Sequence, residues 1–477
     1  MQQPRDSPRG GARQGGESRL HDLDEAAVAA ALDVACAGAL FADLFAEERA
    51  TVAIAYARGS ARVVAIGREA GVAVRSVDKH YGVNFAASDT LAPGGLGALA
   101  RAVATRSGGG RSVRAGRAPQ VSETMELAGG LSDRVRLLDA ARAAALAVDE
   151  SIDDISVSYR ETRQNVFIAA SDRPWGTEAR PQIRVAVQVA ARRKRRRATG
   201  FEVYSSRAGF RAAAEGVRKA AKEAAAQAVA MLDATPVKAG EMDVVVASGY
   251  SGALFHELVG HGLEADAMSR RDTLLAGQLG KQLAGPELTA VDRPWVDGSP
   301  ASAGIDDEGE PTTTTTLVEQ GVVRDALYDR VHAARANRRS TGNGRRGSFA
   351  SPPAPRMRNL IVLASDANPD DVICDTQAGL LARRLGAGQV DAETGEFMFG
   401  VSEGYLIDHG RVVRPISGAI ITGRADIALR SLDAVCNDVA LVDVICGKHG
   451  QGVPVGSGGP TIRLRALTVG GGQRGSS

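Results

Sequence analysis

The feature that most constrains this chain is a His-Glu pair followed by a second histidine, in the run FHELVGHGLE at 255–264. His256 and His261 are five positions apart. On a regular α-helix this spacing separates two side chains by about 140°, whereas a spacing of four separates them by about 40°. One extra residue in the turn, a π-bulge, would bring both imidazoles to one side, and Gly260 makes such a distortion sterically cheap. The motif therefore predicts a distorted helix if both histidines hold one ligand.

Two imidazoles with a carboxylate between them are typical of a catalytic metal site. Neutral His256 and His261 could hold a zinc ion, and Glu257 could take a proton from a water molecule that the metal activates. The competing interpretation is a helix with two unrelated histidines, because the standard zinc helix spaces them by four. A catalytic zinc usually has three protein ligands, so a third ligand must come from elsewhere in the chain.

Cys446 is the best-placed third ligand. It ends the mostly apolar run 439–445 and opens the Gly-rich segment CGKHGQGVPVGSGGP, which predicts a thiolate between a strand end and a flexible loop. A buried, inert cysteine is the alternative, and His449 competes within the same segment. The full set of candidates comprises His21, His80, His332, His409, His449, Cys36, Cys374, Cys436, Cys446, Glu264 and Asp266.

Several motifs together carry a resemblance to the TldD/PmbA family of zinc metalloproteases, and in particular to its catalytic, TldD-like branch. The resemblance covers nearly the whole chain from about Leu20 onward, and its N-terminal matches are loose. It implies zinc on His256, His261 and Cys446, with Glu257 as the catalytic base. The motifs are FHELVGHGLEAD (255–266), GIDDEG (304–309), TGNGRRG (341–347), PRMRNL (355–360), SEGYLI (402–407) and CGKHGQGVPVGSGGPTI (446–462), with GVAVRSV (71–77) and GVNFAAS (82–88).

The resemblance also implies a substrate and a partner. The substrate would be an unstructured peptide, such as the leader of a ribosomally made peptide, or an unfolded small protein. The partner would be a PmbA/TldE-like chain without zinc ligands, in a heterodimer whose chamber excludes folded proteins, and a homodimer is the other possibility. The family is linked to modulation of DNA gyrase as well, so the alternative function is a non-catalytic regulator that binds peptide or nucleic acid.

A run of six basic residues at 192–197 is the feature that would favour nucleic acid. No aromatic residue interleaves with these charges to stack on bases, and the formal net charge of +2 gives no overall preference. We therefore expect a solvated hairpin tip and no nucleic-acid partner.

Two other polar clusters allow a functional and a structural interpretation. The acidic run 306–308 could bind a second cation or a substrate amine, but a solvated turn is the simpler prediction. The segment 343–346 carries two arginines that could recognise substrate carboxylates, because a guanidinium presents a bidentate fork. Its alternative is a mobile loop between Gly and Pro residues.

Hydrophobic periodicity predicts an α+β fold in two parts. Residues 21–235 are expected to form an N-terminal α+β domain with antiparallel sheets, in which helices at 23–48, 92–105, 132–149 and 210–234 flank short strands. Residues 241–477 are expected to form a mainly-β metallopeptidase domain that carries the motif helix. A curved or barrel-like sheet there would return Cys446 to that helix.

The termini, cysteines and hydropathy suggest where the chain works. The polar, Gly-rich stretch 1–20 is expected to be a disordered tail without a signal peptide. Four unevenly spaced cysteines suit a reducing cytoplasm, and no run of about 18 apolar residues predicts a membrane helix. The sequence thus indicates a cytoplasmic location.

Overall fold

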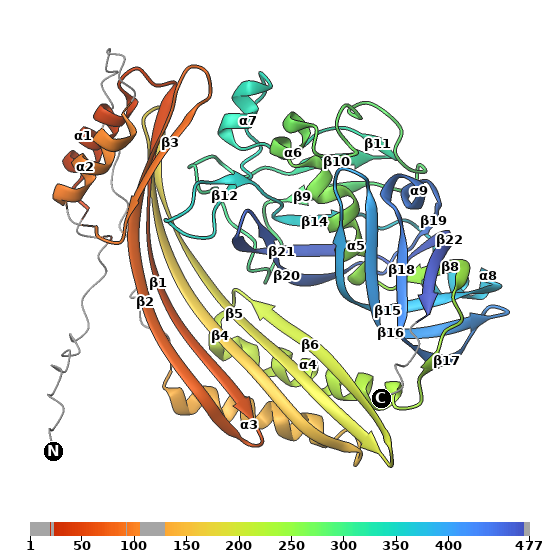
Figure 1. The fold of residues 1–477 in the computed structure, drawn as a ribbon. Coiled ribbons are helices and arrows are strands. Elements are labelled where there is room, and N and C mark those ends of the chain that lie inside the picture. Colours follow the sequence, from red (N-terminus) through yellow and green to blue (C-terminus); the bar gives the residue numbers. More distant parts are fainter. Residues whose placement is uncertain (1–19, 21–22, 92, 105–128, 472–477) are drawn as a thin grey trace, which may run out of the picture.

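A curved antiparallel sheet organises the first half of the chain. The computed structural model describes residues 20, 23–91, 93–104 and 129–471. Six strands lie in the order β3-β2-β1-β4-β5-β6, and β1, β2, β4 and β5 run along the length of the sheet (Figure 1). Their bounds are β1 (Phe41–Ala57), β2 (Ser60–Val77), β3 (Val83–Ser88), β4 (Ile152–Ala170), β5 (Arg173–Arg193) and β6 (Arg196–Ser206).

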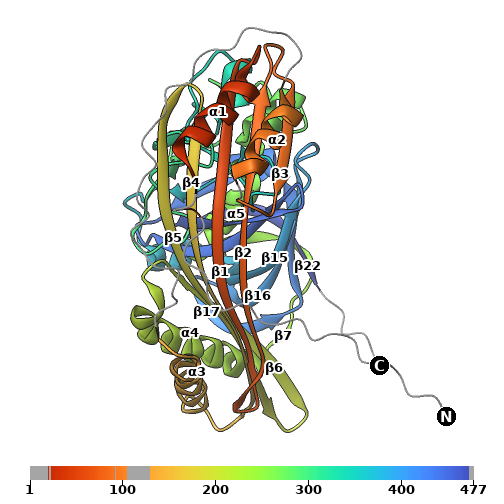
Figure 2. The same cartoon turned by 90° about the vertical axis from the view of Figure 1, so that its left-hand side faces the viewer.

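Strand alternation decides what each face of this sheet contacts. On β1, Leu44 packs into a core with α1 (Glu25–Cys36) and α2 (Pro93–Val103). Ten residues on, Ile54 lies in a second core with α3 (Leu131–Leu146) and α4 (Gly209–Met231). Phe45, one position off this register, instead contacts Ile305 and Phe349 of the C-terminal half. The helix pairs thus sit at opposite ends of the sheet (Figure 2), and the remaining face meets the C-terminal half.

The antiparallel α+β fold is confirmed, with differences in element length. The predicted helix 23–48 ends at Cys36, and its second half belongs to β1. Gly38, at φ 77°, breaks the helix there, and the apolar run ALFADLFA at 39–46 fits a buried strand as well as a helix. The strands between the helices are longer than the short strands that the sequence predicts, as β4 (Ile152–Ala170) shows.

A closed barrel forms part of the C-terminal half. Five strands pair in the order β15-β8-β22-β18-β16, and β16 pairs back to β15 to close the ring. The predicted barrel-like sheet is therefore confirmed. The strands are β8 (Gly240–Val246), β15 (Ala378–Val390), β16 (Glu396–Asp408), β18 (Ala419–Arg424) and β22 (Ile462–Gly471), with β7 (Thr235–Pro236), β17 (Arg411–Ser417) and β19 (Leu432–Val435) attached.

A second C-terminal sheet carries the cysteine. Its strand order is β11-β10-β9-β14-β21-β20, which leaves β20 at one edge. The strands are β9 (Ala290–Arg293), β10 (Thr315–Glu319), β11 (Val322–Val323), β14 (Asn359–Val362), β20 (Ala440–Lys448) and β21 (Gln451–Gly459). Cys446 therefore lies within a strand, and the Gly-rich segment after it is strand β21 rather than a flexible loop. Glycine is needed at Gly459 because a Cβ atom there would lie 2.6 Å from Ser251 Oγ of helix α5 (Tyr250–Phe255).

Short elements complete the C-terminal half. They are β12 (Gly344–Arg345), β13 (Ala354–Pro355), α6 (Ala265–Arg270), α7 (Arg330–Arg335), α8 (Pro369–Asp375) and α9 (Ala425–Arg430). No helix among the described residues is long and apolar enough to cross a bilayer. The division of the chain at 235–241 stays a prediction.

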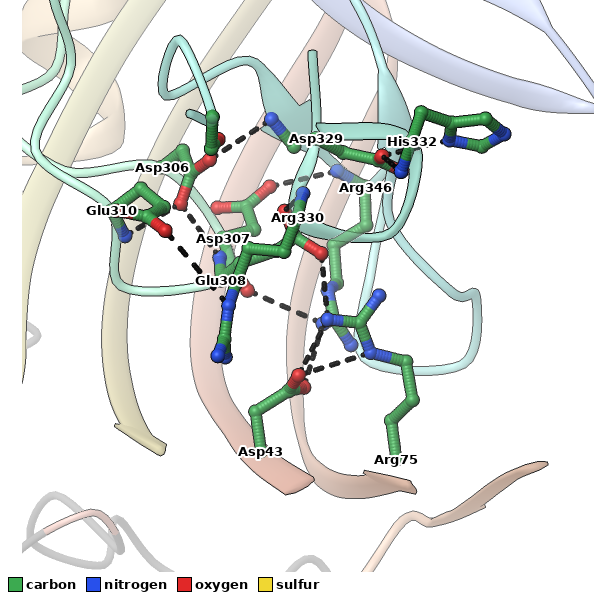
Figure 3. A network of polar contacts seen from close by, with 12 residues as sticks. Asp43, Arg75, Asp306, Asp307, Glu308, Glu310, Asp329, Arg330, His332 and Arg346 are labelled. Atoms are coloured by element: carbon green, nitrogen blue, oxygen red, sulfur yellow. Dashed lines mark hydrogen bonds and ion pairs between the residues drawn. The ribbon is translucent and has the colours of Figure 1, made fainter. Parts of the chain in front are cut away.

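A buried ionic network joins the two halves (Figure 3). Arg75 on β2 donates to Asp43 at 3.0 Å and to Glu308 at 2.6 Å, and all three side chains are at most 2% exposed. The prediction of a solvated turn at 306–308 is therefore wrong. The buried carboxylates are stabilised by guanidinium groups from strands that are distant in the sequence. No local sequence pattern predicts those ion pairs, so the run looks exposed from the sequence alone. Arg345 and Arg346 are buried too, so 343–346 is not an exposed loop.

Candidate metal centre

The histidine motif forms the predicted distortion. Helix α5 (Tyr250–Phe255) continues into the π-turn η2 (His256–Gly260) and then the 3-10 turn η3 (His261–Leu263). The His261 N–H donates to the His256 carbonyl, which closes a turn with one residue more than an α-helix. The expectation that a spacing of five needs a π-type turn is confirmed.

Gly260 has a different role from the predicted one. Its backbone is an ordinary right-handed helical one at φ −59°, so conformational freedom is not what the position needs. A Cβ atom there would lie 2.0 Å from Met357 Sδ. The residue is glycine because the turn packs directly against the Met357 side chain.

Three ligand atoms converge beside this turn. Cys446 Sγ lies 3.3 Å from His256 Nε2 and 3.2 Å from His261 Nε2, and all three atoms lie within 4.8 Å of one another. Within the described part of the chain, no other group of three His, Cys, Asp or Glu side chains meets this criterion. The interpretation of two unrelated histidines does not fit this geometry.

The distances suit a tetrahedral zinc ion. Zinc–nitrogen and zinc–sulfur bonds of about 2.1 and 2.3 Å at a tetrahedral angle place the nitrogen and sulfur about 3.6 Å apart. The observed nitrogen–sulfur separations of 3.3 and 3.2 Å are a few tenths of an ångström shorter, so a small outward shift of the side chains accommodates the ion. The two imidazole planes lie at 87° to each other, so both rings aim at one point from different directions.

The electrostatics favour a cation at this point. Burial opposes ionisation of the Cys446 thiol, but hydrogen bonds and the charges of His256 and His261 outweigh it and lower the pKa of Cys446 to about 5. Burial likewise opposes protonation of His261, yet Glu264 and Cys446 raise its pKa well above the usual value. Thiolate is the form of cysteine that binds metal ions, so the sulfur is prepared for a metal.

Further polar groups orient the two rings. His261 Nδ1 lies 3.0 Å from Glu264 Oε2, which leaves Nε2 free to face Cys446. Lys448 bridges this carboxylate to Asp266, at 2.8 and 2.7 Å respectively. Ser457 Oγ lies 3.4 Å from His256 Nδ1. Such outer contacts set the tautomer and direction of ligating histidines.

Several residues considered as third ligands lie elsewhere. Glu264 contacts the outer nitrogen of His261, and Asp266 contacts His449 at 3.3 Å. His332 and His409 pair with neighbouring aspartates, and His21 lies outside the described residues. Sequence reasoning missed Lys448 and Ser457 as supporting groups. For Glu264, the sequence did offer a signal of its orienting role, because it lies three positions after His261 and can reach the outer nitrogen of that ring.

A cleft of about 680 Å³ opens over the three ligand atoms. Glu257 lines it together with His256, His261 and Cys446. The opposite wall is formed by 386–390 of β15, and the edge strand β20 contributes 444–448. Glu257 thus lines the same cleft as the three ligand atoms. The cleft is large enough for a short stretch of extended peptide.

The basic run forms the turn between β5 and β6. All six side chains at 192–197 are exposed. Arg193 and Arg196 pair with Asp233, and Arg192 pairs with Asp153 at 3.1 Å. The predicted solvated hairpin tip is confirmed.

Comparison with known proteins gives consistent matches. The PmbA/TldA metallopeptidase central domain matches residues 129–232, and the C-terminal domain of the same family matches 239–471. A Haemophilus influenzae protein named Metalloprotease TldD homolog is 35% identical over 347 residues, which cover 71% of this chain and 72% of that protein. A Saccharolobus solfataricus protein named Zinc metalloprotease TldD homolog is 29% identical over 239 residues, covering 49% and 52% respectively.

The fold matches a solved structure as well. TldE from Thermococcus kodakarensis superimposes with a TM-score of 0.74 and 15% identity, over 93% of this chain and 99% of that one. At this identity the likeness concerns the fold alone.

Proposed function

This chain belongs to the TldD/PmbA family of metallopeptidases, and from that premise we propose that it is a zinc-dependent peptidase that hydrolyses unstructured peptides. The observation that carries the proposal is the convergence of His256, His261 and Cys446 at a π-turn beside a cleft. Three protein ligands leave one position open, as catalytic zinc sites do, whereas structural zinc sites usually close with four.

The chemistry follows from the roles of four side chains. His256 and His261 would hold the ion through Nε2, and Cys446 through its thiolate. When bound, zinc supplies a Lewis acid for the substrate carbonyl and lowers the pKa of a water molecule towards neutrality. Glu257 would accept a proton from the attacking water and would donate it to the nitrogen of the leaving amine.

The edge strand β20 offers a way to hold an extended peptide. It pairs with β21 on one side and forms the sheet edge on the other, and its residues 444–448 line the cleft. A substrate strand added to this edge would be bound through its main chain, largely independently of its sequence. Leader peptides of ribosomally made peptides and unfolded small proteins have the required extended form.

We also propose the setting in which the enzyme works. Its partner is a TldE-like chain, consistent with the TldE fold match, or a second copy of itself. Four free cysteines suit the reducing cytoplasm. The N-terminal domain is assigned to 21–235, and the metallopeptidase domain to 241–477.

Metal content tests the ligand set. The purified full-length chain, supplied with zinc, should hold about one zinc ion, and Cys446→Ser and His261→Ala should each lose it. Cys374→Ser and His409→Ala are matched controls, because both residues are exposed and lie outside the cluster. Absence of zinc from the wild type would reject the site and favour the non-catalytic regulator.

Hydrolysis tests the role of Glu257. The variant Glu257→Gln should keep its zinc ion and lose peptide cleavage by at least about 100-fold, the usual contribution of a general base. Turnover retained in this variant would remove Glu257 from the mechanism while leaving the metal site intact.

A further inference from the structure

A second cavity lies between the curved sheet and the C-terminal half. Its volume is about 200 Å³. Strands β1, β4 and β5 form one wall, and the turns at 300–303 and 345–347, with 452–454 of β21, form the other. The cavity has no role in the mechanism above.

The lining of this cavity is strongly basic. Six arginines line it against a single acidic side chain, Asp307. Asp307 accepts from Arg180 at 2.5 Å, and it accepts from the Arg346 backbone N–H at 2.7 Å (Figure 3), so its charge is already shared. The six are Arg49, Arg160, Arg180, Arg345, Arg346 and Arg358.

Half of these arginines have no carboxylate partner. Arg345 donates to the carbonyls of Met357 and Pro454, and Arg358 donates to the carbonyls of Ala301 and Gly342. Neither of them, nor Arg160, forms an ion pair with any described residue. Neutral carbonyls satisfy hydrogen bonds but carry no charge, so the positive charge of Arg345 and Arg358 is offset only by carboxylates that form no ion pair with them, such as Asp307.

Burial, together with charge repulsion between neighbouring arginines, lowers the pKa of Arg345 and Arg358. Burial, followed by the charge of Arg358, lowers the pKa of Arg345 to about 9. Burial also lowers the pKa of Arg346 and of Arg358, and for Arg358 the neighbouring Arg180 adds to it. The Nε atoms of Arg346 and Arg358 find no hydrogen-bond acceptor among the described residues. An anion in this cavity would relieve the repulsion.

The cavity adjoins the metal cleft. Ile445, 49% exposed and next to Cys446, lines both spaces. The edge of β20 thus separates a basic cavity from the ligand atoms by the width of one strand. We propose that this cavity binds a carboxylate of the peptide that lies in the cleft, either its C-terminal α-carboxylate or an acidic side chain. This assignment rests on the proposed peptidase function and adds a preference for acidic substrates to it.

The size and chemistry of the cavity select this occupant. Guanidinium forks match the two oxygens of a carboxylate. A volume of about 200 Å³ admits one such group with some neighbouring chain and is too small for a nucleic-acid helix. Apolar walls from Val453 and Pro454 suit a peptide segment.

Binding to a chain that cannot turn over tests the proposal. The full-length Glu257→Gln variant, supplied with zinc, is titrated with rhodamine-labelled decapeptides, and fluorescence anisotropy gives the Kd. One peptide ends in a free carboxylate, one is amidated and carries glutamates at alternate positions, and one is amidated and neutral. At least one acidic peptide should bind about tenfold more tightly than the neutral peptide, the scale of a charge-assisted hydrogen bond. Tighter binding of the first peptide would assign the cavity to the C-terminal α-carboxylate, and tighter binding of the second would assign it to acidic side chains.

Variants locate the effect. Arg160→Gln, at an exposed position, and Arg345→Gln should bring acidic peptides to the Kd of the neutral one. Arg195→Gln removes the same charge at the exposed β5–β6 turn and should change nothing. If Arg345→Gln does not fold, Arg49→Gln, at a partly exposed position, replaces it.

Three results would overturn the carboxylate assignment. They are equal affinity for all three peptides, a preference that survives Arg160→Gln, and an equal loss in Arg195→Gln. Thermal stabilisation by inorganic phosphate that depends on Arg160, without any peptide preference, would identify a phosphate site instead. Cleavage of the neutral peptide by the wild type is measured separately. The peptidase function and the acidic preference can therefore fail independently.

Discussion

Replacing Glu264 by Gln should weaken zinc binding about 5- to 30-fold, because the isosteric amide keeps only a weaker hydrogen bond to His261. Glu264 is 1% exposed and lies 3.0 Å from His261 Nδ1. Burial opposes its ionisation, but His261 and Lys448 lower its pKa to about 2, so it is a carboxylate at any working pH. A charge-assisted hydrogen bond contributes about 1.5–3 kcal/mol and a neutral one about 0.5–1.5. The isosteric amide therefore loses about 1–2 kcal/mol in holding His261 towards the metal.

The assay is competition for zinc against a chromophoric chelator at pH 7.5, with circular dichroism to verify the fold. Asp266→Asn is the matched control, because Asp266 shares Lys448 with Glu264 but forms its other contacts with His449 and Arg270 rather than with His261. Its zinc affinity should change less than about threefold, since it leaves the His261 hydrogen bond in place. Equal losses in both variants would show that Glu264 acts only as a counter-ion for Lys448. Unchanged affinity in a folded Glu264→Gln chain would refute the orienting role altogether.

Three further predictions follow from the same contacts. Gly260→Ala should lower the free energy of unfolding by about 1–3 kcal/mol because its Cβ would meet Met357, and in thermal denaturation Met357→Ala should relieve part of that loss. Burial raises the pKa of Asp443 to about 6, so the folded chain holds a proton there that the unfolded chain releases, and the contribution of Asp443 to stability should fall as pH rises from about 4 to 6. The pH-dependent melts of Asp443→Asn should lack this contribution of about 1–3 kcal/mol. Chelation of zinc initially 100- to 1,000-fold above Kd should cost about 3–4 kcal/mol of stability in the wild type and nothing in Cys446→Ser, measured by calorimetry.

Local geometry made parts of this structure predictable. The π-turn follows from the spacing of His256 and His261 once both are taken to hold one ligand, because only an added residue per turn aligns positions five apart. The alternation of Ile183, Val185 and Val187 likewise identifies a strand with one buried face, as observed in β5.

Ambiguous periods and distant partners explain the failures. Residues 41–48 fit a helix or a strand, and only pairing with β2 and β4 makes them a strand. The sequence of the acidic run 306–308 suggests a solvated turn. In the structure, Arg75 and Arg180, each more than a hundred residues away in the sequence, pair with this run and bury it. Both errors have one cause, which is that pairing across the sheet or the core outweighs local propensity.

The sequence by itself determined the chemistry that this protein can carry: two histidines and a carboxylate on one distorted turn, after a strand and before a mainly-β half. Tertiary structure decided which residue completes the site. Cys446 reaches His261 across 185 residues because β20 and β21 pack beside helix α5, whereas His449, three residues further on, faces Asp266 instead. Tertiary structure also gathered six arginines into one cavity from separate segments. Turn geometry depends on neighbouring residues and can be read locally, whereas convergence and charge burial depend on how sheets close on one another.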